Sequence, residues 1–372
     1  MKILYCIPRL CNPGGMERIV TMKANWFARH GHDVVMVLSD NKGMSPFFPL
    51  HRSIRIYDLD INYLDDMGIN PLKWHINQWK RRKIHKIELK EVIRREDPDV
   101  IFSVFAEESV FLYGIKHRCR KILEFHFTRR HRLQWGRKGI RRLVDRWRMH
   151  KEGRIASRYD AFVVLTERDS RAWPELDNIH VIPNFVTGIP DVVPDYSRKR
   201  IVAFGRLSHE KGYDRLIKVW SMIYSDYPEW SLDIFGNGEA RDSLISTADS
   251  LVGNDSIVFH DPVENVYEEM LGSSIYVMPS RYEGFSLVLL EAMSVGLPCV
   301  SFDIDCGPSE MIENNKNGFL VPDGDMGKFA GCLRMLMNNE ELRERMGREA
   351  RGISDRFSEA AVMNQWEELL PR

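Results

Sequence analysis

The chain has 372 residues, which suits two domains of about 170–200 residues better than one. Hydrophobic residues make up 44% of it and aromatic residues 10%, enough for two buried cores, so global disorder is excluded. The 53 basic and 53 acidic side chains cancel, yet residues 1–200 carry 38 basic and 24 acidic side chains, whereas residues 201–372 carry 15 and 29. We therefore expect the two halves to meet different partners.

The predicted elements alternate along the whole chain between short β-rich runs and helical patterns, which is typical of parallel α/β layers. Several runs lack an apolar/polar alternation, as expected of strands covered by helices on both faces. The strands predicted in the first half are Lys2–Ile7, Val34–Leu38, Ile54–Asp58, Val100–Val104, Ile122–His126, Ala161–Leu165 and His180–Ile182. Those in the second half are Ile201–Gly205, Leu232–Gly236, Ile257–His260, Ile275–Pro279, Cys299–Phe302 and Phe319–Val321.

The domain boundary is predicted between these two sets of strands. Residues 189–199 show no hydrophobic periodicity and read as a linker between a domain at 1–188 and a domain at 200–355. The last segment, 356–372, has apolar residues at near-helical spacing. Ligands of doubly wound sheets bind outside the carboxyl ends of the strands, so a cleft where the two sheets face each other is the expected site.

The cysteines and the apolar runs indicate in which cellular compartment the protein is expected. Six cysteines without a CxxC pair predict reduced, mostly buried thiols rather than a disulfide framework or a zinc site. The apolar run before Pro8 is too short for a signal peptide, and the most apolar stretch, 285–302, holds Glu291, Gly296 and Pro298 and is a poor membrane span. The sequence predicts a cytoplasmic protein, soluble or peripheral on a membrane.

The first motif is Gly14-Gly15, between a strand and a predicted helix. Glycines there let a ligand approach the backbone, whose free N–H groups favour an anion. A tight strand-to-helix turn explains the pair equally well. A nicotinamide site is disfavoured, because no GxGxxG follows any predicted strand.

The second motif places Arg206 and Lys211 directly after the strand Ile201–Gly205. The two cations supply charge and hydrogen-bond donors suited to a diphosphate. Ordinary surface charge is the alternative reading for either residue alone.

The third motif is EGFSLVLLE, from Glu283 to Glu291. The turn from strand to helix at 284–287 would present free N–H groups, an anion site, with Glu283 beside it. A carboxylate at Glu291, inside an apolar run, is costly unless something binds it. A buried structural acid explains one of these glutamates but not the pair together with the glycine turn.

Taken together, in this order and spacing, the motifs resemble those of the retaining glycosyltransferases of family 4, which have the GT-B fold. The resemblance covers nearly the whole chain and rests on the three motifs together with Gly236-Asn237-Gly238 and the run from Asn317 to Pro322. It implies two Rossmann-like α/β domains around a central cleft, with a C-terminal helix that crosses back to the first domain. The run from Asp305 to Glu310 resembles members that use UDP-hexoses or UDP-N-acetylhexosamines.

The resemblance also implies roles for the matching residues. Arg206 and Lys211 would hold the donor diphosphate, Glu291 the ribose, and Glu283 the transferred sugar. His126, at the end of a predicted strand, would contact the sugar near the reacting centre. The catalytic set is thus His126, Glu283, Arg206 and Lys211. The donor-binding set is Gly14, Gly15, Arg206, Lys211, Asn237, His260, Asp261, Pro262, Glu283, Gly284, Phe285, Ser286, Leu287 and Glu291.

The implied chemistry is retaining transfer with front-face attack by the acceptor, without a cofactor. Arg206, Lys211 and the helix N-terminus at Gly284 would neutralise the departing nucleoside diphosphate without a metal. Asp303 and Asp305 are expected to end a strand rather than to hold Mn²⁺, and no residue is assigned as a covalent nucleophile.

The last feature is a basic segment, 129–158, which holds 12 Arg and Lys against two acids. Its apolar residues fall near one helical face, and a second basic stretch lies at 79–86 with tryptophan nearby. Such segments suit an anionic membrane surface better than nucleic acid, since no nucleic-acid motif accompanies the charge; a solvated helix face is the alternative. The predicted membrane or acceptor residues are Arg129, Arg130, Arg141, Arg142, Arg146 and Arg148.

The function predicted from these features is transfer of a hexose or N-acetylhexosamine from a nucleotide donor, most simply UDP-linked, to a lipid-linked or polysaccharide acceptor at the inner membrane face. One alternative is a sugar-nucleotide epimerase of similar fold, which would turn over the donor without an acceptor. The other is a catalytically silent membrane-binding protein, which would bind anionic vesicles but no donor.

Overall fold

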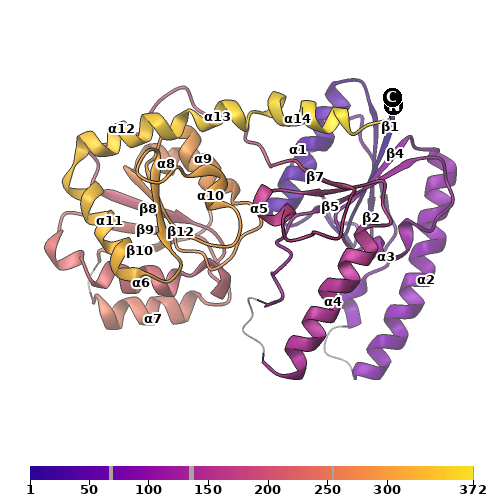
Figure 1. Cartoon of the computed structure of the whole chain (residues 1–372), viewed down its shortest axis with the longest axis horizontal. Helices are drawn as coiled ribbons and strands as arrows, with labels where there is room; N and C mark the ends of the chain where they lie inside the picture. The colour runs from indigo at the N-terminus through magenta and orange to yellow at the C-terminus, as the bar shows by residue number, and fades with distance from the viewer. Residues whose placement is uncertain (67–69, 134–137, 254, 372) are drawn as a thin grey trace. The chain divides into compact units, whose positions relative to one another are not determined.

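The structure, a computed structural model, describes residues 1–66, 70–133, 138–253 and 255–371. It divides into two compact units, one formed by Met1–Ile182 with Met363–Arg372 and the other by Pro183–Val362. Each unit is built on one parallel β-sheet with helices on both faces (Figure 1). The predicted α/β class with two doubly wound sheets is confirmed.

The first unit contains a seven-stranded sheet of order β3-β2-β1-β4-β5-β6-β7. Every strand predicted in the first half is present, with small differences at the ends. The strands are β1 (Lys2–Ile7), β2 (Asp33–Leu38), β3 (Arg55–Asp58), β4 (Val100–Ser103), β5 (Arg120–Phe125), β6 (Ala161–Val164) and β7 (Ile179–Val181). The helices are α1 (Gly15–Arg29), α2 (Pro71–Glu96), α3 (Ser109–Leu112), α4 (Ile140–Ala156) and α5 (Glu167–Ser170).

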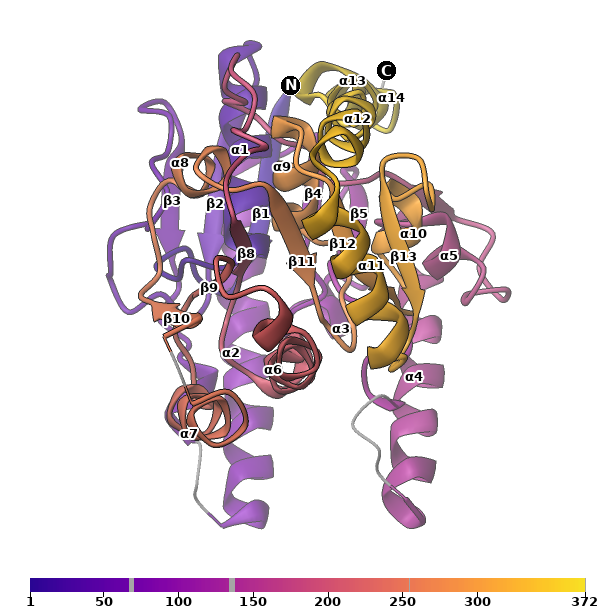
Figure 2. The same cartoon turned by 90° about the vertical axis from the view of Figure 1, so that its left-hand side faces the viewer.

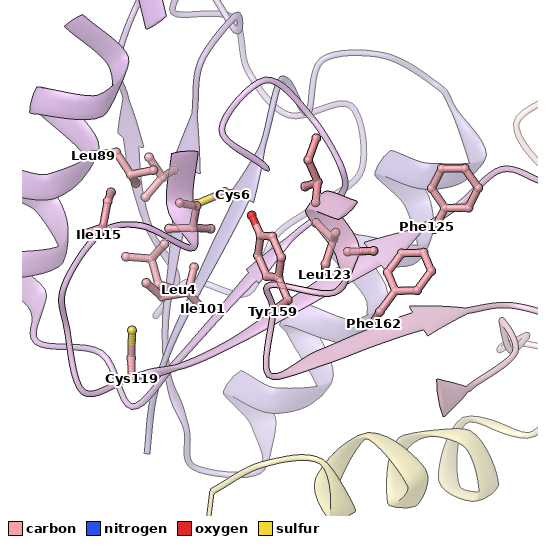
Figure 3. Close-up of a cluster of buried hydrophobic side chains, with 14 of the residues drawn as sticks. Leu4, Cys6, Leu89, Ile101, Ile115, Cys119, Leu123, Phe125, Tyr159 and Phe162 are labelled. Carbon is pink, nitrogen blue, oxygen red and sulfur yellow. The ribbon is translucent and has the colours of Figure 1, made fainter. Parts of the chain in front are cut away.

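The two faces of the first sheet have different packing. Alternate residues of its strands, such as Leu4, Ile101 and Leu123, join side chains from α2, α3 and α4 in one apolar cluster (Figure 3). The intervening residues face α1, where Tyr5 and Phe102 stack with ring centroids 4.6 Å apart. Because side chains of a strand alternate between faces, Glu124 lies on this second face, away from the cluster.

The second unit contains a six-stranded sheet of order β10-β9-β8-β11-β12-β13, turned toward the viewer in Figure 2. Its strands, again as predicted apart from their ends, are β8 (Arg200–Phe204), β9 (Ser231–Phe235), β10 (Ile257–His260), β11 (Ile275–Met278), β12 (Cys299–Asp303) and β13 (Gly318–Pro322). The helices are α6 (Tyr213–Ser221), α7 (Arg241–Leu251), α8 (Val266–Leu271), α9 (Leu287–Val295), α10 (Pro308–Met311), α11 (Met326–Asn338), α12 (Glu340–Arg351) and α13 (Ile353–Arg356). The last helix, α14 (Glu359–Glu368), begins in this unit and ends in the first. α6 packs against α7 and α11, whereas α9 packs against α8, α12 and α13.

The segment 189–199, predicted as the linker between the domains, packs on the second unit. The Tyr196 hydroxyl donates to the carbonyl of Gly296 (2.7 Å), and the Arg343 guanidinium donates to the carbonyl of Tyr196 (2.6 Å). Arg351 donates to two further carbonyls of the segment. These partners lie 100 or more residues away in the sequence, so local composition gives no sign of them.

The C-terminal segment returns to the first unit, as the GT-B resemblance predicts: Met363–Arg372 groups with residues 1–182. Within the segment predicted to be helical from residue 356, helix α14 begins at Glu359, and Arg356 is the last residue of the short helix α13. Among the described residues, no helix combines the length and apolar character needed to cross a bilayer. All six cysteines are free, and all but Cys11 are buried, as expected.

Candidate functional site

The order of the second sheet places its candidate site at the carboxyl ends of β8 and β11. These strands are neighbours, but the chain proceeds from β8 to β9 on one side and from β11 to β12 on the other. In doubly wound sheets, ligands bind at such a reversal of strand order. The loop with Arg206 and Lys211 follows β8, and the turn with Glu283 follows β11, so two of the predicted motifs meet there.

Glycines allow the loops at this edge to pack backbone against backbone. Gly236, after β9, has φ +151°, and a Cβ there would lie 2.0 Å from the carbonyl oxygen of Gly205. Gly212 has φ +71°, and a Cβ there would lie 2.2 Å from the carbonyl oxygen of Pro279. A side chain at either position would push the loops apart. Gly236 and Gly212 thus set the spacing of the loops that carry the charged residues.

Lys211 and Glu283 form an ion pair across the two loops. The Lys211 ammonium lies 2.6 Å from Oε1 of Glu283, and the Ser280 hydroxyl donates to the same oxygen (2.8 Å). Their side chains are 25% and 12% exposed, so the pair is largely shielded from water. No described residue hydrogen-bonds to Oε2 of Glu283. One carboxylate oxygen and part of the Lys211 charge therefore remain for a ligand.

Arg206 and the N-terminus of α9 bring further positive character to this edge. Arg206 is exposed, and among the described residues its side chain has no ion pair or hydrogen bond. α9 begins at Leu287, with Ser286 as its N-cap: the serine hydroxyl accepts from the amide of Leu289 (3.3 Å). The remaining free amides of the first turn and the helix dipole still favour an anion.

Glu291 lies on α9, and its side chain is fully buried. The same is true of Ser294 and of the neighbouring apolar residues of the helix. Burial is the main cause that raises the pKa of Tyr276 on β11, and Glu291 is one of several neighbouring groups that raise it further. For Glu291 to hydrogen-bond to a ribose, neighbouring groups must move aside.

Four residues of the predicted donor-binding set lie at the carboxyl ends of β9 and β10. His260 stacks on Phe235, with ring centroids 4.4 Å apart, and lies 3.0 Å from a carboxylate oxygen of Asp233. Asn237, Asp261 and Pro262 are exposed. These residues stand at the same edge of the sheet as Arg206, because all its strands are parallel.

The glycine pair of the first unit stands where α1 begins. Gly14 is the N-cap and Gly15 the first residue of α1. A Cβ at Gly14 would lie 2.1 Å from Oε2 of Glu17, so the carboxylate of this buried residue already occupies space beside the helix N-terminus. An anionic ligand at this turn would have to share it with Glu17, and donor binding by the pair stays a prediction.

His126 directly follows β5 and is held by a chain of buried charges. Its Nε2 lies 3.1 Å from Oε2 of Glu124, and the Lys23 ammonium lies 2.7 Å from Oε1 of the same carboxylate. Burial alone would raise the pKa of Glu124, but Lys23 and the hydrogen bond from His126 outweigh it and lower the pKa. Burial lowers the pKa of Lys23 to about 8, against the opposing effect of Glu124.

Sequence reasoning missed Lys23 and Glu124, although each left a signal. Lys23 occupies the helical face that also carries Val20 and Phe27, a face expected to be buried. Glu124 interrupts an apolar strand. A cation and an anion in two segments that must both be buried predict an ion pair, because an unpaired buried charge is very costly. Ser280, which donates to Glu283, left no such signal.

The basic segment of the first unit forms much of α4, while residues 134–137 lie outside the described part of the chain. Arg141, Arg142, Arg146 and Arg148 are exposed, as both a membrane surface and a solvated helix face require. Arg130 is exposed too. Arg129 differs: its guanidinium pairs with Glu175 and lies over the ring of Trp173, 4.5 Å away, so it stabilises the fold.

The apolar residues of α4 do not all face the core as an ordinary amphipathic helix would place them. Its outward face carries exposed Ile140 (79%), Leu143 (62%) and Trp147 (57%), whereas Ile155 is buried. α2 also exposes a row of apolar side chains at helical spacing. These side chains are Leu72, Ile76, Trp79 and Ile87. Figures 1 and 2 show α2 and α4 as two long helices that run in similar directions and project beyond the first sheet.

Comparison with known families covers both units. The family model described as Glycosyltransferase Family 4 matches residues 13–187, and the model described as Glycosyl transferases group 1 matches residues 190–353. Together they span nearly the whole chain, with both sets of motifs inside the matched ranges.

Similar proteins are also found, two of them of comparable length. A glycosyltransferase of Haemophilus influenzae is 30% identical over 99% of both chains, and the amylovoran biosynthesis glycosyltransferase AmsD of Erwinia amylovora is 24% identical over 99% of both. The poly(ribitol-phosphate) alpha-N-acetylglucosaminyltransferase of Staphylococcus aureus is 28% identical over 57% of this chain and 44% of its own. In fold, the chain is similar to S. aureus TarM, crystallised with alpha-GlcNAc-glycerol and UDP, with a TM-score of 0.80 at 16% identity over the full length of both chains.

Proposed function

Because the chain belongs to the group 1 glycosyltransferases of family 4, we propose that it is a retaining enzyme that moves a hexose or N-acetylhexosamine from a UDP donor to a lipid-linked or polysaccharide acceptor. Glycosyltransferase activity follows from the family. What we propose beyond the family is the UDP donor, the retaining stereochemistry, the independence from metal and the location at the inner membrane face. The observation that carries it is the set formed by Arg206, Lys211, Glu283 and the N-terminus of α9 at the strand reversal of the second sheet.

The proposed chemistry assigns a task to each of these groups. The bond between the anomeric carbon and the diphosphate oxygen breaks, and the acceptor hydroxyl oxygen bonds to the same face of the sugar. The hydroxyl proton passes to the departing diphosphate. Arg206, Lys211 and the amides at the start of α9 stabilise the charge that develops on that diphosphate, without requiring a metal. Glu283 and His126 contact the sugar.

A panel of nucleotide sugars tests the donor assignment directly. We expect UDP, UDP-hexoses or UDP-N-acetylhexosamines to raise the melting temperature in EDTA, and GDP- and ADP-sugars to have much smaller effects. A ligand at a hundred times its Kd stabilises a protein by about 2.7 kcal/mol, a clear shift. A response confined to other nucleotides would overturn the UDP assignment. If the protein epimerises the sugar of the donor in the absence of any acceptor, it is a sugar-nucleotide epimerase and not a glycosyltransferase.

The membrane part of the proposal rests on the outward faces of α4 and α2. α4 presents Ile140, Val144 and Trp147 to solvent, flanked by the exposed arginines of the same helix. On α2, the Lys83 ammonium lies 3.5 Å from the ring centroid of the exposed Trp79. Exposed apolar and aromatic side chains bordered by cations fit the interface of an anionic bilayer, where each cation contributes about 1 kcal/mol. A surface enzyme could in this way reach a lipid-linked acceptor.

We expect the protein to bind vesicles that contain anionic lipid, not neutral ones, and to dissociate as salt rises, because exposed charges are screened over about 8–10 Å at physiological ionic strength. Reversal of Arg141, Arg142, Arg146 and Arg148 to Glu should abolish vesicle binding in a flotation assay and leave UDP affinity unchanged. Reversal of four exposed cations of the second unit should leave both unchanged. These control residues are Lys218, Lys316, Lys328 and Arg345.

If the α4 variant still floats with anionic vesicles, the basic segment is a solvated surface and does not bind the membrane. Tighter binding to duplex DNA than to vesicles would favour nucleic acid, and a concentration-dependent dimer lost in the variant would favour a second copy of the chain. Vesicle binding without any nucleotide affinity would indicate a silent membrane-binding protein.

A further inference from the structure

The ion pair beneath His126 is unusual in its burial. The side chains of Lys23 and Glu124 are each only 2% exposed. Removing two charges from water is expensive, and well-packed apolar residues in the place of a buried ion pair often give equal or greater stability. Stability alone therefore does not account for this pair, and the group that it contacts suggests another reason.

Glu124 divides its two oxygens between Lys23 and His126. Oε1 accepts from the Lys23 ammonium at 2.7 Å, and Oε2 lies 3.1 Å from Nε2 of His126. Lys23 helps to keep the carboxyl group ionised, since its charge lowers the pKa of Glu124 against the effect of burial. An ionised carboxylate can only accept hydrogen bonds, so Nε2 of His126 carries the proton. The other ring nitrogen, Nδ1, makes no hydrogen bond with any residue that the structure describes.

Aromatic rings fix the position of Lys23. Its ammonium lies 3.2 Å from the ring centroid of Trp366, and 5.3 and 5.6 Å from those of Phe102 and Tyr5. Cation–π attraction and the exclusion of water hold the ammonium in one place. Trp366 belongs to the C-terminal segment that returns to the first unit, so that segment completes the enclosure of the pair.

From this geometry we infer that Lys23 and Glu124, enclosed by Trp366, are positioning residues that fix the tautomer and ring orientation of His126 and leave Nδ1 as the nitrogen presented to the donor sugar. The tautomer is a property of the free protein, whereas the ligand at Nδ1 rests on the proposed function. A histidine with one nitrogen pinned by a carboxylate meets its ligand in a single protonation pattern and orientation.

The matched variants are two double substitutions, Lys23→Met with Glu124→Gln and Lys23→Met with Glu124→Leu. Both remove the ion pair, and in both the apolar methionine avoids leaving an unpaired charge. Only glutamine retains an oxygen that accepts from Nε2 of His126. The two variants therefore separate loss of charge from loss of orientation. Leu4→Ala, in the cluster on the opposite face of the sheet, controls for general destabilisation.

The first measurement needs no substrate. Long-range ¹H–¹⁵N spectra of protein labelled at its 12 histidines, with the His126 signals assigned by His126→Ala, report which ring nitrogen carries the proton. In the neutral form of the His126 ring, we expect the Nε2–H tautomer to dominate in the wild type, in Leu4→Ala and in the glutamine variant, and to lose its dominance in the leucine variant. An unchanged tautomer in the leucine variant would overturn the inference, as would an Nδ1–H tautomer in the wild type.

The second measurement is the rate of UDP release at saturating acceptor from the UDP-sugar that the donor panel identifies. We expect the leucine variant to lose about ten- to hundredfold in kcat, the worth of a charge-assisted hydrogen bond, with little change in donor KM. The glutamine variant should retain most of the rate. In a His126→Ala background, the leucine variant should cause no further loss. An equal loss with and without His126 would mean that the pair acts on the fold and not through the histidine.

The two measurements keep this inference separate from the proposed function. If the tautomer depends on Glu124 but His126→Ala leaves turnover intact, the role of His126 in transfer is wrong and the positioning inference stands. If His126→Ala lowers turnover but neither tautomer nor rate depends on Glu124, the positioning inference is wrong.

Discussion

Arg206→Ala should lose about a hundred- to a thousandfold in turnover, the loss seen when a donor aimed at developing negative charge is removed. Arg206 is exposed, and within the described residues its side chain has no ion pair or hydrogen bond, so its removal breaks no contact of the fold. Lys211 differs, because it neutralises Glu283 at 2.6 Å in the free protein. Arg206 is therefore the cation whose whole charge is available to a departing diphosphate.

The measurement is kcat and donor KM with and without EDTA, for the wild type, Arg206→Ala and a control, Lys218→Ala, an exposed cation on α6. EDTA should leave the wild-type rate unchanged, because the protein supplies the positive charge. The control should match the wild type. Full activity in Arg206→Ala would exclude the arginine from the clamp, and an absolute requirement for Mn²⁺ would overturn the metal-independent mechanism.

The two glutamates of the third motif should separate by kinetics. Glu283 lies beside the proposed reaction centre, where contacts strengthen as charge develops, so Glu283→Gln should lower kcat by about ten- to hundredfold and change donor affinity less. Glu291 would bond the ribose equally in the ground and transition states, so Glu291→Gln should mainly weaken donor binding. The structure adds a second reason for the Glu283 effect, since the substitution also removes the anion that holds Lys211.

Calorimetry with UDP and turnover at saturating acceptor distinguish these outcomes. Weaker binding alone in Glu283→Gln, with slower chemistry alone in Glu291→Gln, would reverse the two roles. Because Glu291 is fully buried, a variant with unchanged UDP affinity and unchanged turnover would identify it as a structural acid. Unchanged behaviour in both variants would remove this motif from the site.

The fold could be predicted from the sequence because most of its strands are buried on both faces. Continuous apolar runs such as that of β11 (Ile275–Met278) stand out against the polar turns between them. The charged residues at the carboxyl ends of these strands could be located for the same reason, because the end of an apolar run marks where the following loop begins. Arg206 and Glu283 follow a predicted strand directly or within a few residues, and His126 is the last residue of one.

Pairings between distant residues could not be predicted in the same way. Lys23 and Glu124 are 101 positions apart, and Lys211 and Glu283 are 72 apart. Each of these residues also has an ordinary reading as a surface or structural charge, so only the folded chain shows which charges meet. The outward apolar face of α4 is a similar case, because periodicity reveals that a face exists but not which way it points.

The cysteines give the chain a practical property. Burial raises the pKa of Cys119 to about 11 and also raises those of Cys6, Cys299 and Cys332, so these thiols remain protonated and shielded from electrophiles. Cys11 alone among the six is partly exposed, three residues before Gly14. The unaltered protein thus offers one site for a maleimide fluorophore, and that site lies on the loop where a donor is proposed to approach α1.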